Sequence, residues 1–252
     1  EVEPNLRARW EPTGQQTFWA AVSRAVRTPS RLDRDLAEPY VPPSLIVGSP
    51  DFKSETLVAE ELGYRAAFGR RASVSVSLFY NQYDDLRGLA LTPVTTLPLV
   101  YRNVLRADTY GAELSVDYDL LPWWKLHGGY TRLEEDVRMK PGRTDLQQAL
   151  GETEDPRDQF SLRSSMDLPR NFEFDVLFRS VGTLQTNNFS TPGSVPAYAE
   201  LDARLGWRPT DVIELSLVGR NLLEPHHPEY GFPGASREEL QRGIYGKVAL
   251  RF

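Results

Sequence analysis

The stretch Ile-Tyr-Gly-Lys-Val-Ala-Leu-Arg-Phe, residues 244–252, decides the fold of this chain. Successive side chains of a β-strand point to opposite faces of the sheet, so a strand here would sort these residues into two rows. One row is apolar and comprises Ile244, Val248, Leu250 and Phe252. The other row comprises Tyr245, Lys247, Ala249 and Arg251. The stretch therefore predicts a β-strand with one apolar and one polar face.

The same alternation recurs about ten times before this stretch, in segments close to the length of a transmembrane strand. It is clearest at residues 110–120, 172–180, 198–208 and 213–220. In the last of these, Leu217 falls in the apolar row and Ser216 in the polar row. Acidic and basic side chains mix in the polar rows, which suits a wet lumen with ion pairs. We therefore predict an all-β, antiparallel, up-and-down transmembrane β-barrel, of which this chain supplies about eleven strands.

Two kinds of connection separate these segments, and they alternate strictly along the chain. The short connections contain Gly, Pro, Asn or Asp, which favour tight turns. They lie at residues 12–14, 69–71, 121–122, 169–171 and 209–211. The long connections are polar and proline-rich, and they lie at roughly 28–53, 84–107, 137–155, 183–196 and 222–240. This sorting is typical of a transmembrane barrel with short periplasmic turns and longer extracellular loops.

The order of the connections also orients the strands. The last strand leaves a long loop, so Phe252 should lie on the periplasmic side, and every short turn then falls on that side. Bacterial single-chain barrels normally have an even number of strands. An odd count in a chain that starts at Glu1 without a signal peptide leads us to expect further strands upstream. We expect residues 1–252 to form a single, partial barrel domain.

The composition excludes several other classes of protein. Of the 252 residues, 40% are hydrophobic and 25% charged, and no run of about 18 apolar residues could form a transmembrane helix. The chain has no cysteine, which excludes disulfides and thiolate metal sites. Its formal net charge of -6 argues against a nucleic-acid partner.

Aromatic side chains gather near the expected strand ends, where they could form the girdle that marks a membrane–water interface. They are Trp10, Tyr64, Phe68, Tyr118, Trp123, Trp124 and Trp207. Aromatic residues also favour β-strands in general, and this alternative interpretation stays open.

Several segments resemble the C-terminal part of TonB-dependent outer-membrane receptors. The first reads Phe-Trp-Ala-Ala-Val-Ser-Arg-Ala-Val-Arg-Thr-Pro-Ser-Arg at residues 18–31. It is followed by Ser54-Glu55, Glu61-Leu62-Gly63-Tyr64, Leu78-Phe79-Tyr80-Asn81, Tyr110-Gly111-Ala112-Glu113-Leu114 and Gly219-Arg220-Asn221-Leu222-Leu223. The terminal strand through Phe252 completes the series. Each motif is weak alone, but their order and spacing cover nearly the whole chain.

The resemblance implies that this chain is close to the C-terminal half of a twenty-two-stranded barrel in a bacterial outer membrane. The implied partners are outer-membrane lipid and a TonB system, reached through an N-terminal plug domain that has no counterpart in these residues. The implied function is active uptake of a scarce nutrient, most often an iron–siderophore complex, with cobalamin or another chelate as further ligands. A passive, porin-like diffusion channel is the main alternative, and a soluble β-sheet binding protein is the second.

The first long loop carries three arginines followed by a tyrosine, and arginine forks suit carboxylates and phosphates. An anionic iron chelate would meet these side chains at the extracellular mouth, although the same segment also resembles an ordinary mixed-charge loop. A second candidate, Tyr-Arg-Asn, lies late in the next loop. The candidate ligand-binding residues are Arg27, Arg31, Arg34, Tyr40, Tyr101 and Arg102.

No catalytic constellation stands out, so we predict neither enzymatic activity nor catalytic residues nor a cofactor. His226 and His227, flanked by Pro225 and Pro228, are candidate metal ligands. Adjacent side chains in an extended loop point apart and rarely reach the same ion, so we predict no metal site there.

Overall fold

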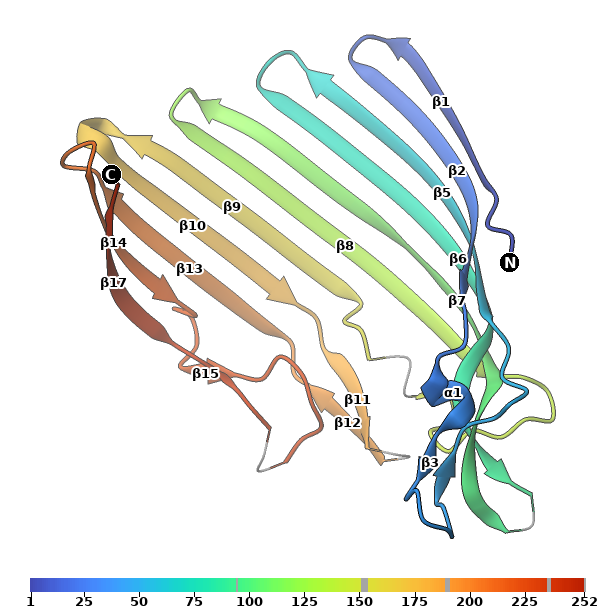
Figure 1. Cartoon of the computed structure of the whole chain (residues 1–252). Coiled ribbons are helices and arrows are strands. Elements are labelled where there is room, and N and C mark those ends of the chain that lie inside the picture. The colour runs from blue at the N-terminus through green and yellow to red at the C-terminus, as the bar shows by residue number, and fades with distance from the viewer. Residues whose placement is uncertain (94, 151–153, 189–190, 235–236, 252) are drawn as a thin grey trace.

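The computed structural model of the chain describes residues 1–93, 95–150, 154–188, 191–234 and 237–251 (Figure 1). Its main feature is a curved sheet in which eleven strands follow one another along a continuous path. They are β1 (Asn5–Thr13), β2 (Gln16–Arg27), β5 (Glu55–Phe68), β6 (Ala72–Thr92), β7 (Thr96–Leu121), β8 (Trp124–Met139), β9 (Asp158–Leu168), β10 (Phe172–Val181), β13 (Tyr198–Trp207), β14 (Ile213–Arg220) and β17 (Gly243–Leu250). Each strand pairs antiparallel with the next one along this path, which confirms the predicted fold class.

The remaining elements belong to the connections. The first long connection contains α1 (Arg31–Asp35), β3 (Ala37–Glu38) and β4 (Ile46–Val47), and β4 pairs in parallel with β7. Later connections contain two hairpins, made by β11 (Leu184–Asn188) with β12 (Thr191–Val195) and by β15 (His226–His227) with β16 (Leu240–Gln241). One short connection is the turn η2 (Pro169–Asn171). Within the described residues, no helix is long and apolar enough to cross a membrane.

The short connections lie where the sequence predicts them, between neighbouring strands of the path. Gly69, between β5 and β6, has a φ of 63°, a left-handed conformation that glycine adopts without steric cost. Arg170 and Asn171, between β9 and β10, have the same φ of 62°, which asparagine tolerates better than most residues. Because these turns are tight, they fix which residues face each other on the adjoining strands.

The apolar and polar rows predicted for the strands lie on opposite faces of the sheet. Leu217 pairs across the sheet with Leu205 and Gly246, whereas its neighbour Ser216 pairs with Gly206 and Lys247. The row of side chains that includes Leu217 faces outward, and Leu217 itself is 55% exposed. An exposed apolar row of this kind is expected for a face that contacts lipid.

The opposite face of the sheet, which we call the inner face, carries an ion-pair network centred on Arg204 of β13. The Arg204 guanidinium lies 2.9 Å from Glu173 and 3.1 Å from Asp175, both on β10. It also lies 2.7 Å from Glu214 on β14, which in turn pairs with Arg251 at 2.8 Å. The polar rows therefore carry mixed charges that pair across strands, as the sequence predicts for a lumen wall.

Aromatic side chains form contacts close to the short turns. The ring centroids of Trp10 and Phe18 lie 5.4 Å apart, and those of Phe18 and Tyr64 lie 4.6 Å apart. On strands β10 and β13, the rings of Phe172 and Trp207 stack with 5.6 Å between their centroids. Their position at the ends of the strands is the one expected for an interfacial girdle.

Side-chain packing explains why the Glu61-Leu62-Gly63-Tyr64 motif contains a glycine. Trp19 pairs with Gly63 across β2 and β5, and the Trp19 indole lies directly over the glycine. A β-carbon at position 63 would come within 2.0 Å of the indole ring, so any larger residue would displace Trp19. The motif therefore makes room for a large aromatic side chain on the neighbouring strand.

The expectation of a loop at residues 84–107 is wrong. β6 continues to Thr92 and β7 already begins at Thr96, so both strands extend beyond the sheet as one long hairpin (Figure 1). A small buried core of Ala90, Val104, Leu105 and Ala149 supports this extension. The connections at 183–196 and 222–240 also contain more regular structure than expected, because each includes a hairpin.

Candidate functional site

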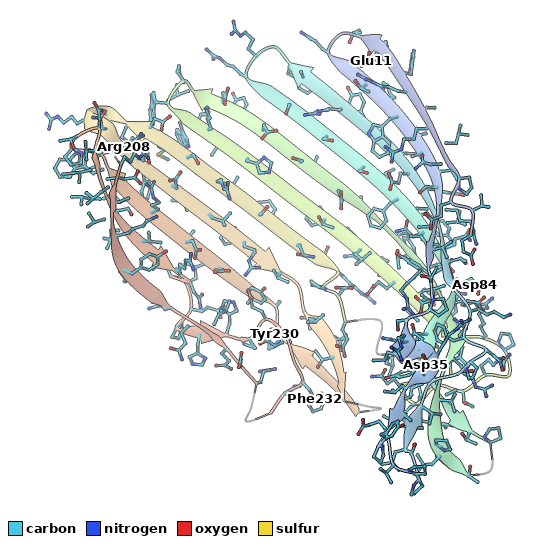
Figure 2. The ribbon with its side chains drawn as sticks, in the orientation of Figure 1. Glu11, Asp35, Asp84, Arg208, Tyr230 and Phe232 are labelled. Atoms are coloured by element: carbon cyan, nitrogen blue, oxygen red, sulfur yellow. The ribbon has the colours of Figure 1, made fainter. Side chains whose placement is uncertain are left out.

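The six candidate ligand-binding residues lie at the end of the sheet that carries the long connections. Figure 2 shows Asp35 and Asp84 at this end, opposite to Glu11 and Arg208 at the short-turn end. Arg27 is the last residue of β2, Arg31 and Arg34 belong to α1, Tyr40 follows β3, and Tyr101 and Arg102 belong to the extended part of β7.

Three of the candidates meet around the segment that precedes β5. The Arg27 guanidinium lies 5.9 Å from the centroid of the Phe52 ring. Arg34 donates a hydrogen bond from Nη2 to the Phe52 carbonyl oxygen at 3.3 Å. Arg102 lines a cavity together with Phe52 and Lys53. Residues far apart in the sequence thus form one group, which we call the loop cluster: Arg27, Arg34, Phe52, Lys53 and Arg102.

The structure places the other three candidates outside the loop cluster. The Arg31 side chain is 95% exposed and pairs with Asp35 at 3.6 Å within α1. Tyr40 is 88% exposed. The Tyr101 ring lies 5.2 Å from the guanidinium of Arg87 and is therefore already engaged in a cation–π contact.

A buried carboxylate holds α1 in place beside the loop cluster. Asp33 is fully buried and accepts hydrogen bonds from the backbone nitrogen of Ser30 at 2.8 Å and from its hydroxyl at 2.9 Å. It also accepts from Arg27 at 3.1 Å and from Arg87 at 3.2 Å. Ser30 in return caps the helix at the nitrogen of Asp33, so both residues form a capping box.

Arg27 is held by a second carboxylate on the neighbouring strand. Its Nε and Nη2 atoms each donate to an oxygen of Glu55 at 2.6 Å, which is the bidentate geometry of a strong ion pair. Glu55 also accepts a hydrogen bond from the backbone nitrogen of Arg87 at 2.8 Å. Arg27 therefore links β2, β5 and α1, and its first role in this structure is to position the loop.

The electrostatics of Asp33 reflect this role. Burial by itself raises the pKa of the carboxyl group, but the hydrogen bonds from Ser30 and Arg27 outweigh it and lower the pKa to about 2. Sequence reasoning identified Arg27 and missed Asp33. The spacing Ser30-x-x-Asp33 was the available signal, since it is the spacing of a capping box at a helix start.

Replacing Asp33 by Asn should loosen the first long loop. The change leaves Arg27 and Arg87 without their shared anionic partner, so we expect local opening to become easier by about 1–3 kcal/mol. The backbone nitrogen of Ser49 bonds to the Asp33 carbonyl oxygen, and its amide hydrogen exchange reports this opening. Exchange should accelerate by at least several-fold in the complete protein.

The matched control is Asp35→Asn, which removes an exposed carboxylate from the same helix. Equal exchange rates at Ser49 in the two variants would contradict the anchoring role of Asp33. Acidification should act in the same direction as the substitution. Because the pKa of Asp33 is lowered, its stabilising contribution is complete above about pH 4 and disappears as the pH falls toward 2.

The loop cluster borders two adjoining cavities. The first has a volume of about 410 Å³ and includes four basic side chains, Lys53, Arg102, Lys140 and Arg143, against two acidic ones, Asp51 and Asp85. The second has a volume of about 480 Å³ and includes the basic residues Arg34 and Lys53 against the acidic residues Glu1, Asp51 and Asp85. Both cavities share Asp51, Phe52, Lys53 and Asp85, so Arg34 and Arg102 lie around one concave region.

Asn103 holds the two sides of this region together. Its side chain accepts a hydrogen bond from the backbone nitrogen of Lys53 at 2.7 Å and donates to the Lys53 carbonyl oxygen at 3.0 Å. It also donates to the carbonyl oxygen of Asp85 at 2.6 Å. Of the Tyr-Arg-Asn segment, the asparagine is therefore the structural residue, while Arg102 is exposed at the cavity.

Basic side chains outnumber acidic ones in the first cavity, which suits an anionic ligand. Lys140 is neutralised by Asp84 and Asp85, each at 2.6 Å. Arg34 and Arg102 present guanidinium groups, which form strong, directional hydrogen bonds with carboxylates and phosphates. Sequence reasoning missed Lys140 and Arg143, which come from the next long connection and reach the cavity only because that connection folds back over β6 and β7.

Comparison with known proteins identifies the family. Residues 1–222 match the model of the family described as TonB dependent receptor-like, beta-barrel. The chain therefore belongs to the TonB-dependent receptors, and it is an outer-membrane β-barrel protein. The long connections then lie on the extracellular side and the short turns on the periplasmic side.

Solved structures share the fold at low sequence identity. The chain is similar to the FrpB iron transporter from Neisseria meningitidis, with a TM-score of 0.76 and 15% identity over 100% of this chain and 39% of that chain. It is similar to the ferripyoverdine receptor of Pseudomonas aeruginosa, with a TM-score of 0.74 and 17% identity over 98% of this chain and 32% of that chain. It is also similar to the ferric-catecholate import receptor Fiu from Escherichia coli K12, with a TM-score of 0.75 and 19% identity over 98% and 34% of the two chains. The chain thus spans about a third to two fifths of the length of these proteins.

Proposed function

We propose that this chain is the C-terminal part of a receptor for TonB-coupled active uptake of a scarce nutrient across the outer membrane. The observation that carries the proposal is the family match over residues 1–222. The ligand class that we propose is an iron–siderophore complex, because several structurally similar proteins are named as iron or siderophore receptors. In this proposal the protein binds and moves its ligand and catalyses no reaction.

The proposal is tested by uptake into cells that carry the complete receptor. Cells would be given a panel of labelled ferric siderophores, with cobalamin as a further ligand, in the presence and absence of a functional TonB system. Accumulation of one ligand that requires both the receptor and TonB is the expected result. Accumulation that requires the receptor and persists without TonB would instead identify a passive, porin-like channel.

We further propose that the concave region between Arg34 and Arg102 contacts the ligand. Both guanidinium groups border the adjoining cavities, and a charge-assisted hydrogen bond contributes about 1.5–3 kcal/mol. Arg31 and Tyr40, which are highly exposed, would make the first contacts with the arriving ligand. Arg27 and Tyr101 would support the site from behind, since their side chains are engaged with Glu55 and Arg87.

Replacing both Arg34 and Arg102 by Ala should weaken ligand binding to the complete receptor by at least about tenfold, or 1.4 kcal/mol. The measurement is equilibrium binding of the transported ligand to whole cells with matched receptor abundance. Arg70→Ala is the matched control, because Arg70 is an exposed arginine in a short turn at the opposite end of the sheet. Unchanged affinity in the double variant would rule out this region as the binding site.

A further inference from the structure

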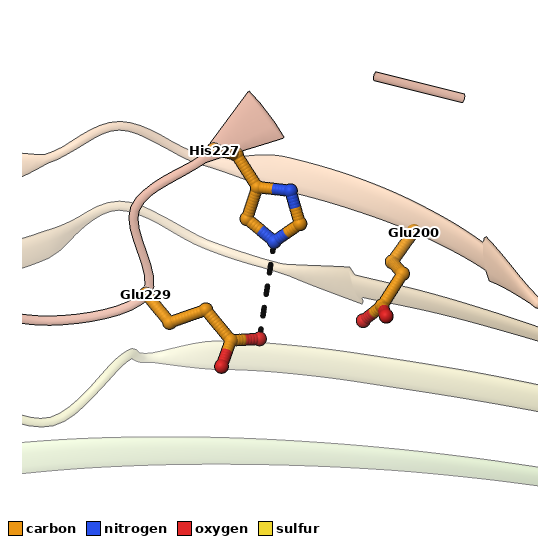
Figure 3. A group of neighbouring side chains, drawn as sticks. All are labelled: Glu200, His227 and Glu229. Carbon is orange, nitrogen blue, oxygen red and sulfur yellow. Dashed lines mark ion pairs between the residues drawn. The ribbon is translucent and has the colours of Figure 1, made fainter. Parts of the chain in front are cut away.

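A second group of side chains lies on the inner face at the extracellular end, apart from the loop cluster. Glu200 belongs to β13, His227 to β15, and Glu229 follows β15 in the last long connection (Figure 3). One carboxylate oxygen of each glutamate and one ring nitrogen of His227 lie within 4.8 Å of one another. The adjacent histidine does not take part, since His226 pairs with Glu239 at 2.5 Å.

His227 is the unusual member of this group. Only 3% of its side chain is exposed, and neither ring nitrogen has a hydrogen-bond partner among the described residues. Its Nε2 atom points toward Glu229 Oε1 at 3.8 Å, a distance too long for a hydrogen bond (Figure 3). The ring stacks on Tyr198 with 4.3 Å between centroids, so its orientation is fixed by packing. A buried imidazole that is held in place without a partner points to a ligand between it and the carboxylates.

We propose that His227, Glu200 and Glu229 bind a divalent transition-metal ion such as Zn²⁺. Zinc binds histidine nitrogen and carboxylate oxygen at about 2.0–2.2 Å in tetrahedral geometry, so two ligand atoms of one ion lie roughly 3.3–3.6 Å apart. The 3.8 Å between His227 Nε2 and Glu229 Oε1 is only slightly longer than this separation. The ligand atoms of the whole group lie within 4.8 Å of one another, so an inward rotation of a glutamate side chain would bring all three residues to one ion. An imidazole ligand favours zinc and similar ions over Ca²⁺ or Mg²⁺.

The neighbouring side chains orient the two carboxylates for this role. Arg179 donates to Glu200 Oε2 at 2.6 Å and also bonds to Glu229 Oε1. Tyr198 donates its hydroxyl hydrogen to Glu229 Oε1 at 3.1 Å. Hydrogen bonds of this kind around metal ligands fix their geometry. With one arginine and two glutamates, the group has a net charge of -1 before an ion binds, so a divalent cation is attracted to it.

The ion would attach the last long connection to the strand beside it. Glu200 lies on β13, whereas His227 and Glu229 lie in the connection between β14 and β17. Occupancy of the site therefore joins an extracellular loop to the inner face of the barrel wall. This role is independent of the proposed chelate uptake, because it concerns a bare metal ion and a different set of residues.

The test is Zn²⁺ binding to the complete, chelator-treated receptor in detergent, measured by calorimetry without any siderophore. We expect one ion per receptor, a raised melting temperature on binding, and no displacement by excess Ca²⁺. His227→Gln and Glu229→Gln should each weaken binding by about tenfold or more. His226→Ala is the matched control and should bind Zn²⁺ like the unmodified protein.

Several results would overturn the proposal. They are the absence of stoichiometric Zn²⁺ binding, equal binding by His227→Gln, and an equal loss in His226→Ala. Misfolding is recognised separately, because a folded outer-membrane barrel resists unfolding by detergent at room temperature. Each variant is checked for this resistance before the Zn²⁺ titration. If His227→Gln fails that check, Glu229→Gln alone decides, since its side chain has the same size and lacks only the charge.

Discussion

Leu217→Arg is expected to destabilise the folded barrel by about 2–4 kcal/mol if position 217 lies near the bilayer midplane. Leu217 belongs to the outward apolar row of β14, opposite Leu205 on β13 and Gly246 on β17. An arginine there must either place its charge in hydrocarbon or bend away toward the interface, and both are costly. The measurement is a folding titration of the complete receptor in lipid vesicles.

Ser216→Arg is the matched control, because it introduces the same side chain one residue away. Ser216 belongs to the inner row of β14, beside Glu214 and across from Lys247. The inner face already accommodates mixed charges in ion pairs, so we expect a much smaller cost there. Equal costs for the two variants, or a larger cost for Ser216→Arg, would contradict the assignment of the two faces.

The sheet could be predicted from the sequence because its signals are local. Alternation has a period of two residues, and each short turn carries residues that adopt turn conformations regardless of the rest of the chain. Gly69 and Asn171 illustrate this, since both have the positive φ that their residue types favour. Neither signal depends on contacts with distant residues. The number of strands in the whole barrel came from the family resemblance.

The extension of β6 and β7 could not be predicted in the same way. Pro93 and Pro98 and the polar residues around them indicate a loop, and a loop was expected. The strands continue because distant residues stabilise them. Asp145 accepts a hydrogen bond from the backbone nitrogen of Leu89, and Ala149 completes the small core under the hairpin. Contacts across more than fifty residues outweighed local preference.

The candidate sites also depend on contacts between distant residues, which the local sequence does not reveal. The arginines of the first loop stand out in the sequence, but nothing there indicates that Arg27 is bound by Glu55 and Asp33 while Arg34 borders a cavity. The sequence predicts that the side chains of His226 and His227 point apart, and they have different partners: His226 pairs with Glu239, whereas His227 lies beside Glu200 and Glu229. The sequence did not indicate that a single histidine would meet two glutamates, one of them on another strand.

The isolated chain of residues 1–252 should not form a stable monomer in a membrane or in detergent. Within the described residues, β1 pairs only with β2 and β17 pairs only with β14, so both edges of the curved sheet are open (Figure 1). An open edge exposes backbone N–H and C=O groups, and each unsatisfied group costs several kcal/mol in hydrocarbon. We therefore expect aggregation or oligomerisation through these edges, whereas the complete receptor should be monodisperse under the same conditions.

Size-exclusion chromatography and heat resistance on electrophoresis measure this difference directly. The chain has no cysteine, so Arg7→Cys on β1 and Lys247→Cys on β17 can be added as a pair and joined by a flexible thiol cross-linker. Cross-links between molecules are expected, because each open edge pairs with another copy. A heat-resistant monomer with an efficient link inside one molecule would show instead that β1 and β17 meet. The eleven strands would then close into a small barrel, and the sheet would satisfy its own edges.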